Sequence, residues 1–150
     1  MSVQQNTFDI LSELQQNALK IDDAQAEQFV NQIKKANHIF LQGAGRSGIA
    51  IRGFANRLLH LGFSVSMVGE ISSPHTKPGD LVIIGSGSGE TGSLVSLAKK
   101  AASSGVNVAL VTMKAESTIG QLATSVLVLP GTVKEDNDRQ EGTFSQPMGS

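Results

Sequence analysis

Residues 85–92 combine glycines with hydroxyl side chains in a pattern that suits an anion. They read Gly-Ser-Gly-Ser-Gly-Glu-Thr-Gly, after an apolar run and before an amphipathic one. Glycines let backbone amides close around an anion, and the N-terminus of the following helix adds unsatisfied N–H groups. A terminal phosphate, with three oxygens and about two negative charges, also accepts hydrogen bonds from hydroxyls. We therefore predict a phosphomonoester site formed by Ser86, Gly87, Ser88, Gly89, Glu90 and Thr91.

The same residues have simpler interpretations. Ser and Thr at this place often only cap the following helix. Glu90 lies near the start of that helix, where a carboxylate compensates the helix dipole. No Lys follows the glycines, which argues against a nucleoside-triphosphate loop.

A second glycine-rich loop, residues 43–48, reads Gly-Ala-Gly-Arg-Ser-Gly and also lies between an apolar run and a helical pattern. It matches the dinucleotide fingerprint, and Glu70 stands where a ribose-binding acid would. Glycines at such a place are equally what a tight strand-to-helix turn needs. Ser47 would complete the phosphate site if the two loops face each other. Arg46 would either steer the anion or pair with Glu70, and the sequence does not choose.

The two loops belong to a repeated strand-and-helix pattern that begins at residue 39. Short aliphatic runs predict strands at 39–41, 65–68, 81–84, 106–111 and 126–129, and helical patterns cover 47–61, 90–103 and 117–123. Such a pattern is typical of a parallel sheet covered on both faces. We predict a doubly wound, flavodoxin-like, five-stranded parallel α/β fold. In that fold the first and third strands are neighbours, so that both loops open into one crevice.

Two amphipathic helices precede the first strand. The first carries an apolar stripe, and the second is expected to begin at Asp22 or Asp23 and to bury Phe29, Val30 and Ile33. The first stripe has no obvious cover within one chain, so we expect a homodimer or homotetramer with this helix at the contact. The stripe consists of Phe8, Leu11, Leu14, Ala18 and Ile21.

Composition removes several classes of function. The net charge is −1, with 12 basic and 13 acidic residues and no cluster of either sign, so neither nucleic acid nor an anionic membrane is an expected partner. No cysteine is present and the three histidines are widely spaced, so we expect no disulfide and no metal. The N-terminus lacks the pattern of a signal peptide, and no apolar run approaches the roughly 18 residues of a membrane span. We expect a cytoplasmic single domain over residues 1–150.

The two loops resemble those of the SIS (sugar isomerase) domain. Further segments are similar to the 6-phospho-3-hexuloisomerase family, namely residues 57–63, 68–70, 79–91 and 146–150. The resemblance implies interconversion of 3-hexulose 6-phosphate and fructose 6-phosphate, as in the ribulose monophosphate pathway of formaldehyde fixation. It also implies no organic cofactor, a tetramer, and a sugar phosphate held by Ser47, Ser86, Ser88 and Thr91.

The catalytic acid and base are harder to assign. In this family the Pro-Met-Gly-Ser segment continues into Leu-Phe-Glu, and the resemblance implies that this glutamate is the base. We therefore expect the base, a C-terminal helix and a tail to follow Ser150, and residues 1–150 alone to bind substrate but turn it over slowly. Within the chain, Glu70, Glu90, His60 and His75 are possible participants, and His60 is proposed as an acid that would serve a neighbouring subunit.

Two rival functions remain open. SIS domains also occur in regulators that sense a sugar phosphate, although no helix-turn-helix precedes residue 39 here. A nicotinamide-binding domain is favoured by residues 43–48 and Glu70, but the hydroxyl-rich loop argues against it.

Overall fold

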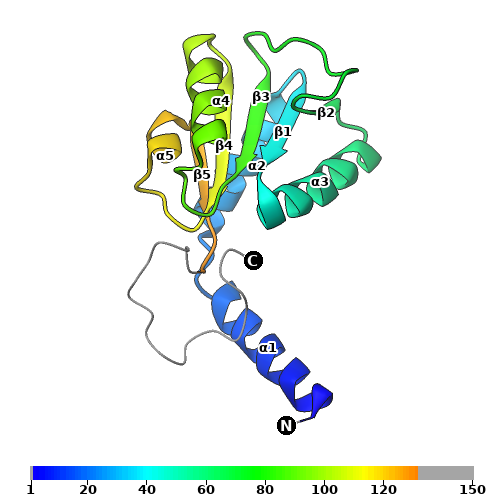
Figure 1. Cartoon of the computed structure of the whole chain (residues 1–150), viewed down its shortest axis with the longest axis vertical. Coiled ribbons are helices and arrows are strands. Elements are labelled where there is room, and N and C mark those ends of the chain that lie inside the picture. The colour runs from blue at the N-terminus through cyan, green and yellow to red at the C-terminus, as the bar shows by residue number, and fades with distance from the viewer. Residues whose placement is uncertain (1, 132–150) are drawn as a thin grey trace.

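The computed structural model describes residues 2–131 as an α/β domain from which one helix projects (Figure 1). Five strands form the sheet, namely β1 (Ile39–Gly43), β2 (Val65–Met67), β3 (Leu81–Gly85), β4 (Asn107–Thr112) and β5 (Ser125–Val128). The helices are α1 (Val3–Ala18), α2 (Asp23–Lys35), α3 (Gly45–His60), α4 (Gly92–Ser103) and α5 (Thr118–Leu122). None of these helices is both long enough and apolar enough to cross a membrane.

All strand pairs are parallel, and the strand order is β2-β1-β3-β4-β5. This is the doubly wound order that the alternation of strands and helices predicts, with β1 and β3 adjacent. The segment between β2 and β3 contains no helix, as its two prolines indicate. The predicted fold is therefore confirmed.

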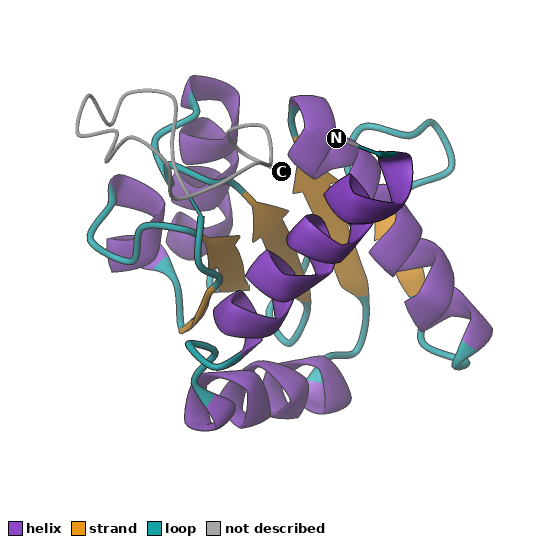
Figure 2. Cartoon of the chain, turned by 90° about the horizontal axis from the view of Figure 1, so that it is seen from below, coloured by secondary structure: helices purple, strands orange, loops and turns teal. Residues whose placement is uncertain are grey.

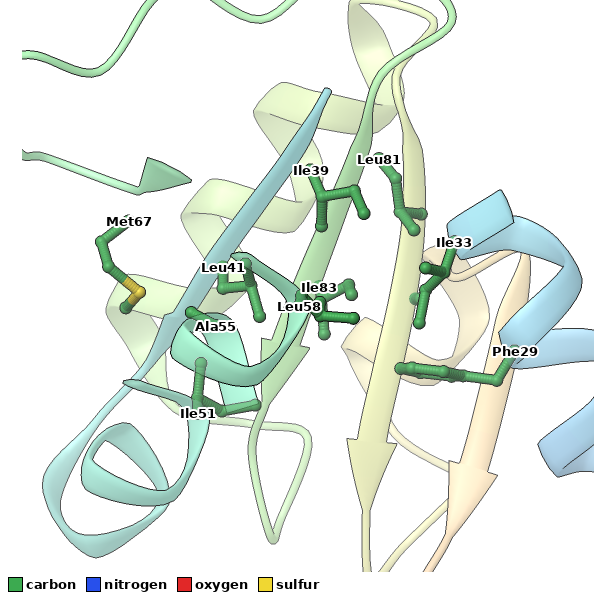
Figure 3. Close-up of a cluster of buried hydrophobic side chains, with 11 residues drawn as sticks. Phe29, Ile33, Ile39, Leu41, Ile51, Ala55, Leu58, Met67, Leu81 and Ile83 are labelled. Carbon is green, nitrogen blue, oxygen red and sulfur yellow. The ribbon is translucent and has the colours of Figure 1, made fainter. Parts of the chain in front are cut away.

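Two apolar clusters hold the helices to the two faces of the sheet, and the view in Figure 2 shows helices on both sides of the strands. Strand residues alternate between the clusters because successive side chains point to opposite faces. On one face Ile39 and Ile83 pack with residues of α2 and α3, as Figure 3 shows. On the other face Phe40 and Val82 pack with residues of α4 and α5.

The N-terminal region departs from the prediction in two respects. Asp22 caps α2 by accepting hydrogen bonds from the Ala24 and Gln25 amides, and Phe29 and Ile33 are buried as expected. Val30, however, is 44% exposed, so its placement on the inner face of α2 is wrong. Ile21 lies beyond the end of α1 rather than on it, because the helix ends at Ala18.

Helix α1 has no buried residue, and it projects from the end of the α/β body (Figure 1). Phe8 is 58% exposed, and Leu11 and Leu14 are exposed as well. The apolar stripe of α1 is thus uncovered within residues 2–131.

Candidate functional site

The two glycine-rich loops leave neighbouring strands at the same edge of the sheet. Gly43 ends β1, Gly85 ends β3, and the two residues are paired in the register of the strands. Both loops therefore begin side by side at the carboxyl ends of the strands, where open α/β sheets bind their ligands.

Close packing explains the glycines of the first loop. A Cβ on Gly43 would lie 2.9 Å from Gly48 Cα, and a Cβ on Gly48 would lie 2.8 Å from Gly43 O. Gly45 has a φ of +56°, in the left-handed region that favours glycine. A tight strand-to-helix turn is thus sufficient reason for this pattern, without a dinucleotide.

The helices that follow the two loops lack side-chain caps. The N-caps of α3 and α4 are Ala44 and Thr91, and neither makes a side-chain cap hydrogen bond. The other three helices are capped by Ser2, Asp22 and Ser117. Amides in the first turns of α3 and α4 are therefore not satisfied by a cap, and helix N-termini of this kind attract anions.

The hydroxyls of the second loop form a hydrogen-bonded network. Ser86 Oγ lies 3.2 Å from Thr91 Oγ1 and accepts a hydrogen bond from the Gly89 amide at 3.1 Å. Ser88 Oγ accepts a hydrogen bond from the Glu90 amide at 3.1 Å. Thr91 thus pairs with Ser86 instead of capping α4. The Ser86–Thr91 pair connects the start of the loop to its end.

Glu90 points toward α5. Its Oε1 accepts a hydrogen bond from the Thr118 amide at 2.6 Å, at the first residue of that helix. The hydrogen bonds from Thr118 lower the pKa of this exposed carboxyl from its ordinary value of 4.5, and Lys114 adds a weaker effect in the same direction. The carboxylate therefore ties the loop to α5.

A cleft of about 640 Å³ opens beside the two loops, and volumes of this size suit small molecules. Ser47, Ser86 and Gly87 line it, whereas Ser88, Gly89, Glu90 and Thr91 lie outside its lining. Helix α1 and the chain after β5 form further walls. The lining residues are Leu14, Asn17, Ala18, Ile21, Arg46, Ser47, Ile49, Ala50, Ile51, Gly85, Ser86, Gly87, Val111, Thr112, Met113, Leu129 and Pro130.

The structure resolves one alternative for the charged residues. Glu70 Oε1 lies 3.4 Å from Arg52 Nη1 in an exposed ion pair, and Arg46 lines the cleft. Arg46 is thus placed where it can meet an anion. The sequence alone does not indicate Arg52 as the partner of Glu70.

The two histidines considered for catalysis lie outside the cleft lining. His60 is the last residue of α3, whose sixteen residues span about 24 Å, and Ser47 is in the first turn of the same helix. His60 and His75 are both exposed. Among residues 2–131, no Asp, Glu or His lines the cleft.

Thr112 and Met113 are among the lining residues that sequence reasoning missed. Thr112 ends β4, which pairs with β3, and Met113 follows it directly. Their signal was available, because the carboxyl end of the strand next to β3 must border the same loop.

Comparisons with known proteins agree with this geometry. The sequence model of the SIS domain family matches residues 32–140. The 3-hexulose-6-phosphate isomerase of Bacillus subtilis is 44% identical over 150 residues, which are all of this chain and 80% of that protein. This enzyme name is another form of 6-phospho-3-hexuloisomerase.

Solved structures give the same result. A hypothetical protein of Methanococcus jannaschii, with an inferred function of 3-hexulose-6-phosphate isomerase, superposes with a TM-score of 0.73. It is 33% identical, over 86% of this chain and 76% of that one. The Vibrio vulnificus NanR protein, solved in complex with ManNAc-6P, also gives a TM-score of 0.73, at 27% identity over 83% of this chain and 49% of that one.

The relatives thus agree with the geometry of the site, in which two loops and two uncapped helices meet beside a cleft. The chain belongs to the SIS domain family, among its 3-hexulose-6-phosphate isomerase members.

Proposed function

We propose that the chain is a sugar-phosphate isomerase that interconverts 3-hexulose 6-phosphate and fructose 6-phosphate. The observation that carries this proposal is the meeting of two hydroxyl-bearing loops, each followed by an uncapped helix, at one cleft. The names of the relatives supply the identity of the sugar. A cytoplasmic location stays a prediction.

The phosphate is proposed to bind to the hydroxyls of Ser47, Ser86, Ser88 and Thr91. Ser47 and Ser86 line the cleft, and Thr91 lies within 3.2 Å of Ser86 through their hydroxyl oxygens. The uncapped N-termini of α3 and α4 add amide donors and a favourable dipole. Arg46, a basic residue of the lining, would add positive charge near the anion.

The reaction moves a carbonyl from C3 to C2 of the sugar. A base removes the proton from C2, an enediol forms between C2 and C3, and the proton returns to C3. An acid must protonate the oxygen that becomes a hydroxyl. Binding the phosphate fixes the distal end of the sugar, so that C2 and C3 lie at a constant position along the cleft.

The catalytic base is proposed to be a residue that is not among residues 2–131 of this subunit. This agrees with the absence of Asp, Glu and His from the cleft lining of that part of the chain. The family resemblance points to a glutamate beyond Ser150. His60 stays a prediction as an acid that serves a neighbouring subunit.

A homo-oligomer is proposed to cover the apolar stripe of α1. Phe8, Leu11 and Leu14 are exposed, and the last of these also lines the cleft. A second copy packed on the stripe would therefore lie next to the site. Multi-angle light scattering at tens of micromolar tests this, and a monodisperse monomer would contradict it.

A second candidate function is a sugar-phosphate sensor without catalysis. The likeness to NanR in complex with ManNAc-6P favours it, because that protein has the same fold and is solved with a phosphosugar. A coupled assay with fructose 6-phosphate separates the two functions. Turnover that is lost in Ser86→Ala supports the isomerase, whereas saturable binding without turnover in the full-length protein supports the sensor.

A further inference from the structure

The hydroxyl-rich loop is tied to the segment that follows β4. The carbonyl oxygen of Gly87 accepts two hydrogen bonds, one from the Met113 amide at 3.0 Å and one from Thr112 Oγ1 at 3.0 Å. Gly89 O accepts a third from the Ile119 amide at 3.2 Å. The carbonyl groups of Gly87 and Gly89 are therefore directed at residues 112–119.

The direction of the Gly87 carbonyl sets the direction of the next amide. In a trans peptide the C=O and N–H bonds point to opposite sides, and the described residues contain no cis peptide bond. Because Gly87 C=O points toward Thr112 and Met113, the Ser88 N–H points away from them. If this peptide were rotated by half a turn, the Gly87 carbonyl oxygen would take the place of the Ser88 N–H on the side away from Thr112 and Met113. There it would repel a bound anion.

Thr112 is well placed to fix this peptide. The residue is 2% exposed, and its Oγ1 accepts a hydrogen bond from the Lys114 amide at 3.1 Å. Because Oγ1 accepts there, its own proton is available to a carbonyl oxygen. Two carbonyl oxygens are within reach, and Gly87 O at 3.0 Å is nearer than Lys114 O at 3.3 Å. The hydroxyl is thus held in one orientation by its own neighbours.

We propose that Thr112 is a positioning residue for the phosphate site, and that it orients the Gly87 peptide so that the Ser88 amide donates to the bound phosphate. Thr112 acts through the loop. The proposal rests on the proposed function and adds to it a side chain from a third strand and a specific amide donor.

The test compares Thr112→Val, which keeps the shape and removes the hydroxyl, with Thr112→Ser, which keeps the hydroxyl. Isothermal titration calorimetry measures their affinities for inorganic phosphate and for fructose 6-phosphate. We expect Thr112→Val to lose about fivefold in affinity for both, which corresponds to one hydrogen bond. We expect Thr112→Ser to bind as the wild type does.

Thr124→Val is the matched control. Thr124 Oγ1 donates to Val108 O at 3.0 Å, so that variant also removes a hydroxyl-to-carbonyl hydrogen bond, but before β5 and outside the cleft lining. We expect it to alter the free energy of unfolding without changing phosphate affinity. Equal affinity losses in the two valine variants, or an equal loss in Thr112→Ser, would overturn the positioning role.

The amide resonance of Ser88 gives an independent measurement on the wild-type protein, whatever the stability of the variants. We expect its proton to shift downfield in two-dimensional NMR as inorganic phosphate is added, and an unmoved resonance would overturn the proposal. A wild-type protein that binds phosphate through Ser88 but does not isomerise fructose 6-phosphate would contradict the proposed function alone. A wild-type protein that binds no phosphate would contradict both.

Discussion

Replacing Ser86 by alanine should damage both binding and stability, because its hydroxyl has two roles. The residue is 3% exposed, lines the cleft and accepts the hydrogen bond from the Gly89 amide. Loss of a hydrogen bond to a charged ligand costs roughly 1.5–3 kcal/mol. We therefore predict that the dissociation constant for fructose 6-phosphate rises about 10- to 150-fold.

The same substitution leaves the buried Gly89 amide without its acceptor. An unsatisfied buried group of this kind costs about 1–3 kcal/mol in the free energy of unfolding. Ser88→Ala should weaken binding with a smaller loss of stability, because Ser88 is only half-buried. Denaturant unfolding and calorimetry, run on the same preparations, separate the two effects.

Ser96→Ala serves as the control. Ser96 is exposed on α4 and its hydroxyl bonds only to Gly92 O within that helix. We expect unchanged affinity in this variant. Unchanged affinity for fructose 6-phosphate in both Ser86→Ala and Ser88→Ala would refute the assignment of the loop.

Three further predictions concern other parts of the structure. Because the pKa of Glu90 is lowered, its carboxylate stabilises the fold fully above pH 4.5, and this contribution is lost as pH falls through the lowered pKa. The unfolding free energies of the wild type and Glu90→Gln should therefore differ at pH 7 and converge in acid. Phe8→Asp together with Leu11→Asp should reduce the proposed oligomer to a smaller species in light scattering while the far-UV circular dichroism stays unchanged. Gly85→Ala should destabilise the protein by about 1–3 kcal/mol in denaturant unfolding, because the added Cβ would lie 2.5 Å from a side-chain carbon of Ile51, and an unaltered midpoint would contradict that packing.

The sheet was predictable because its strands are short, aliphatic and spaced by helices. The doubly wound fold also predicts that β1 and β3 are adjacent, and that Ser47 and Ser86, which follow them, lie close together. Ligand sites in such folds lie at the carboxyl ends of adjacent strands. Helix ends were predicted less well. The helix after β3 was expected from Glu90, yet α4 begins at Gly92, because Ser86 and Thr91 pair with each other and extend the loop.

Contacts between distant segments were not predictable. Nothing in the local sequence indicates that Glu90 bonds to the Thr118 amide, or that Arg52 and not Arg46 pairs with Glu70. Val30 was misplaced because the apolar pattern of α2 is broader than the face that contacts the sheet. Residues 146–150, which carry part of the family resemblance, lie outside the described residues.

Hydrogen exchange at carbon tests the proposed isomerase most directly. Fructose 6-phosphate is incubated with the protein in D₂O and followed by proton NMR. An enediol between C2 and C3 predicts loss of the H3 signal and the appearance of 3-hexulose 6-phosphate, with both changes slowed in Ser86→Ala. Exchange accumulates with time, so that even a slow enzyme is detected. Intact H3 in a sugar that calorimetry shows to be bound, or exchange at C1 instead, would contradict the assignment.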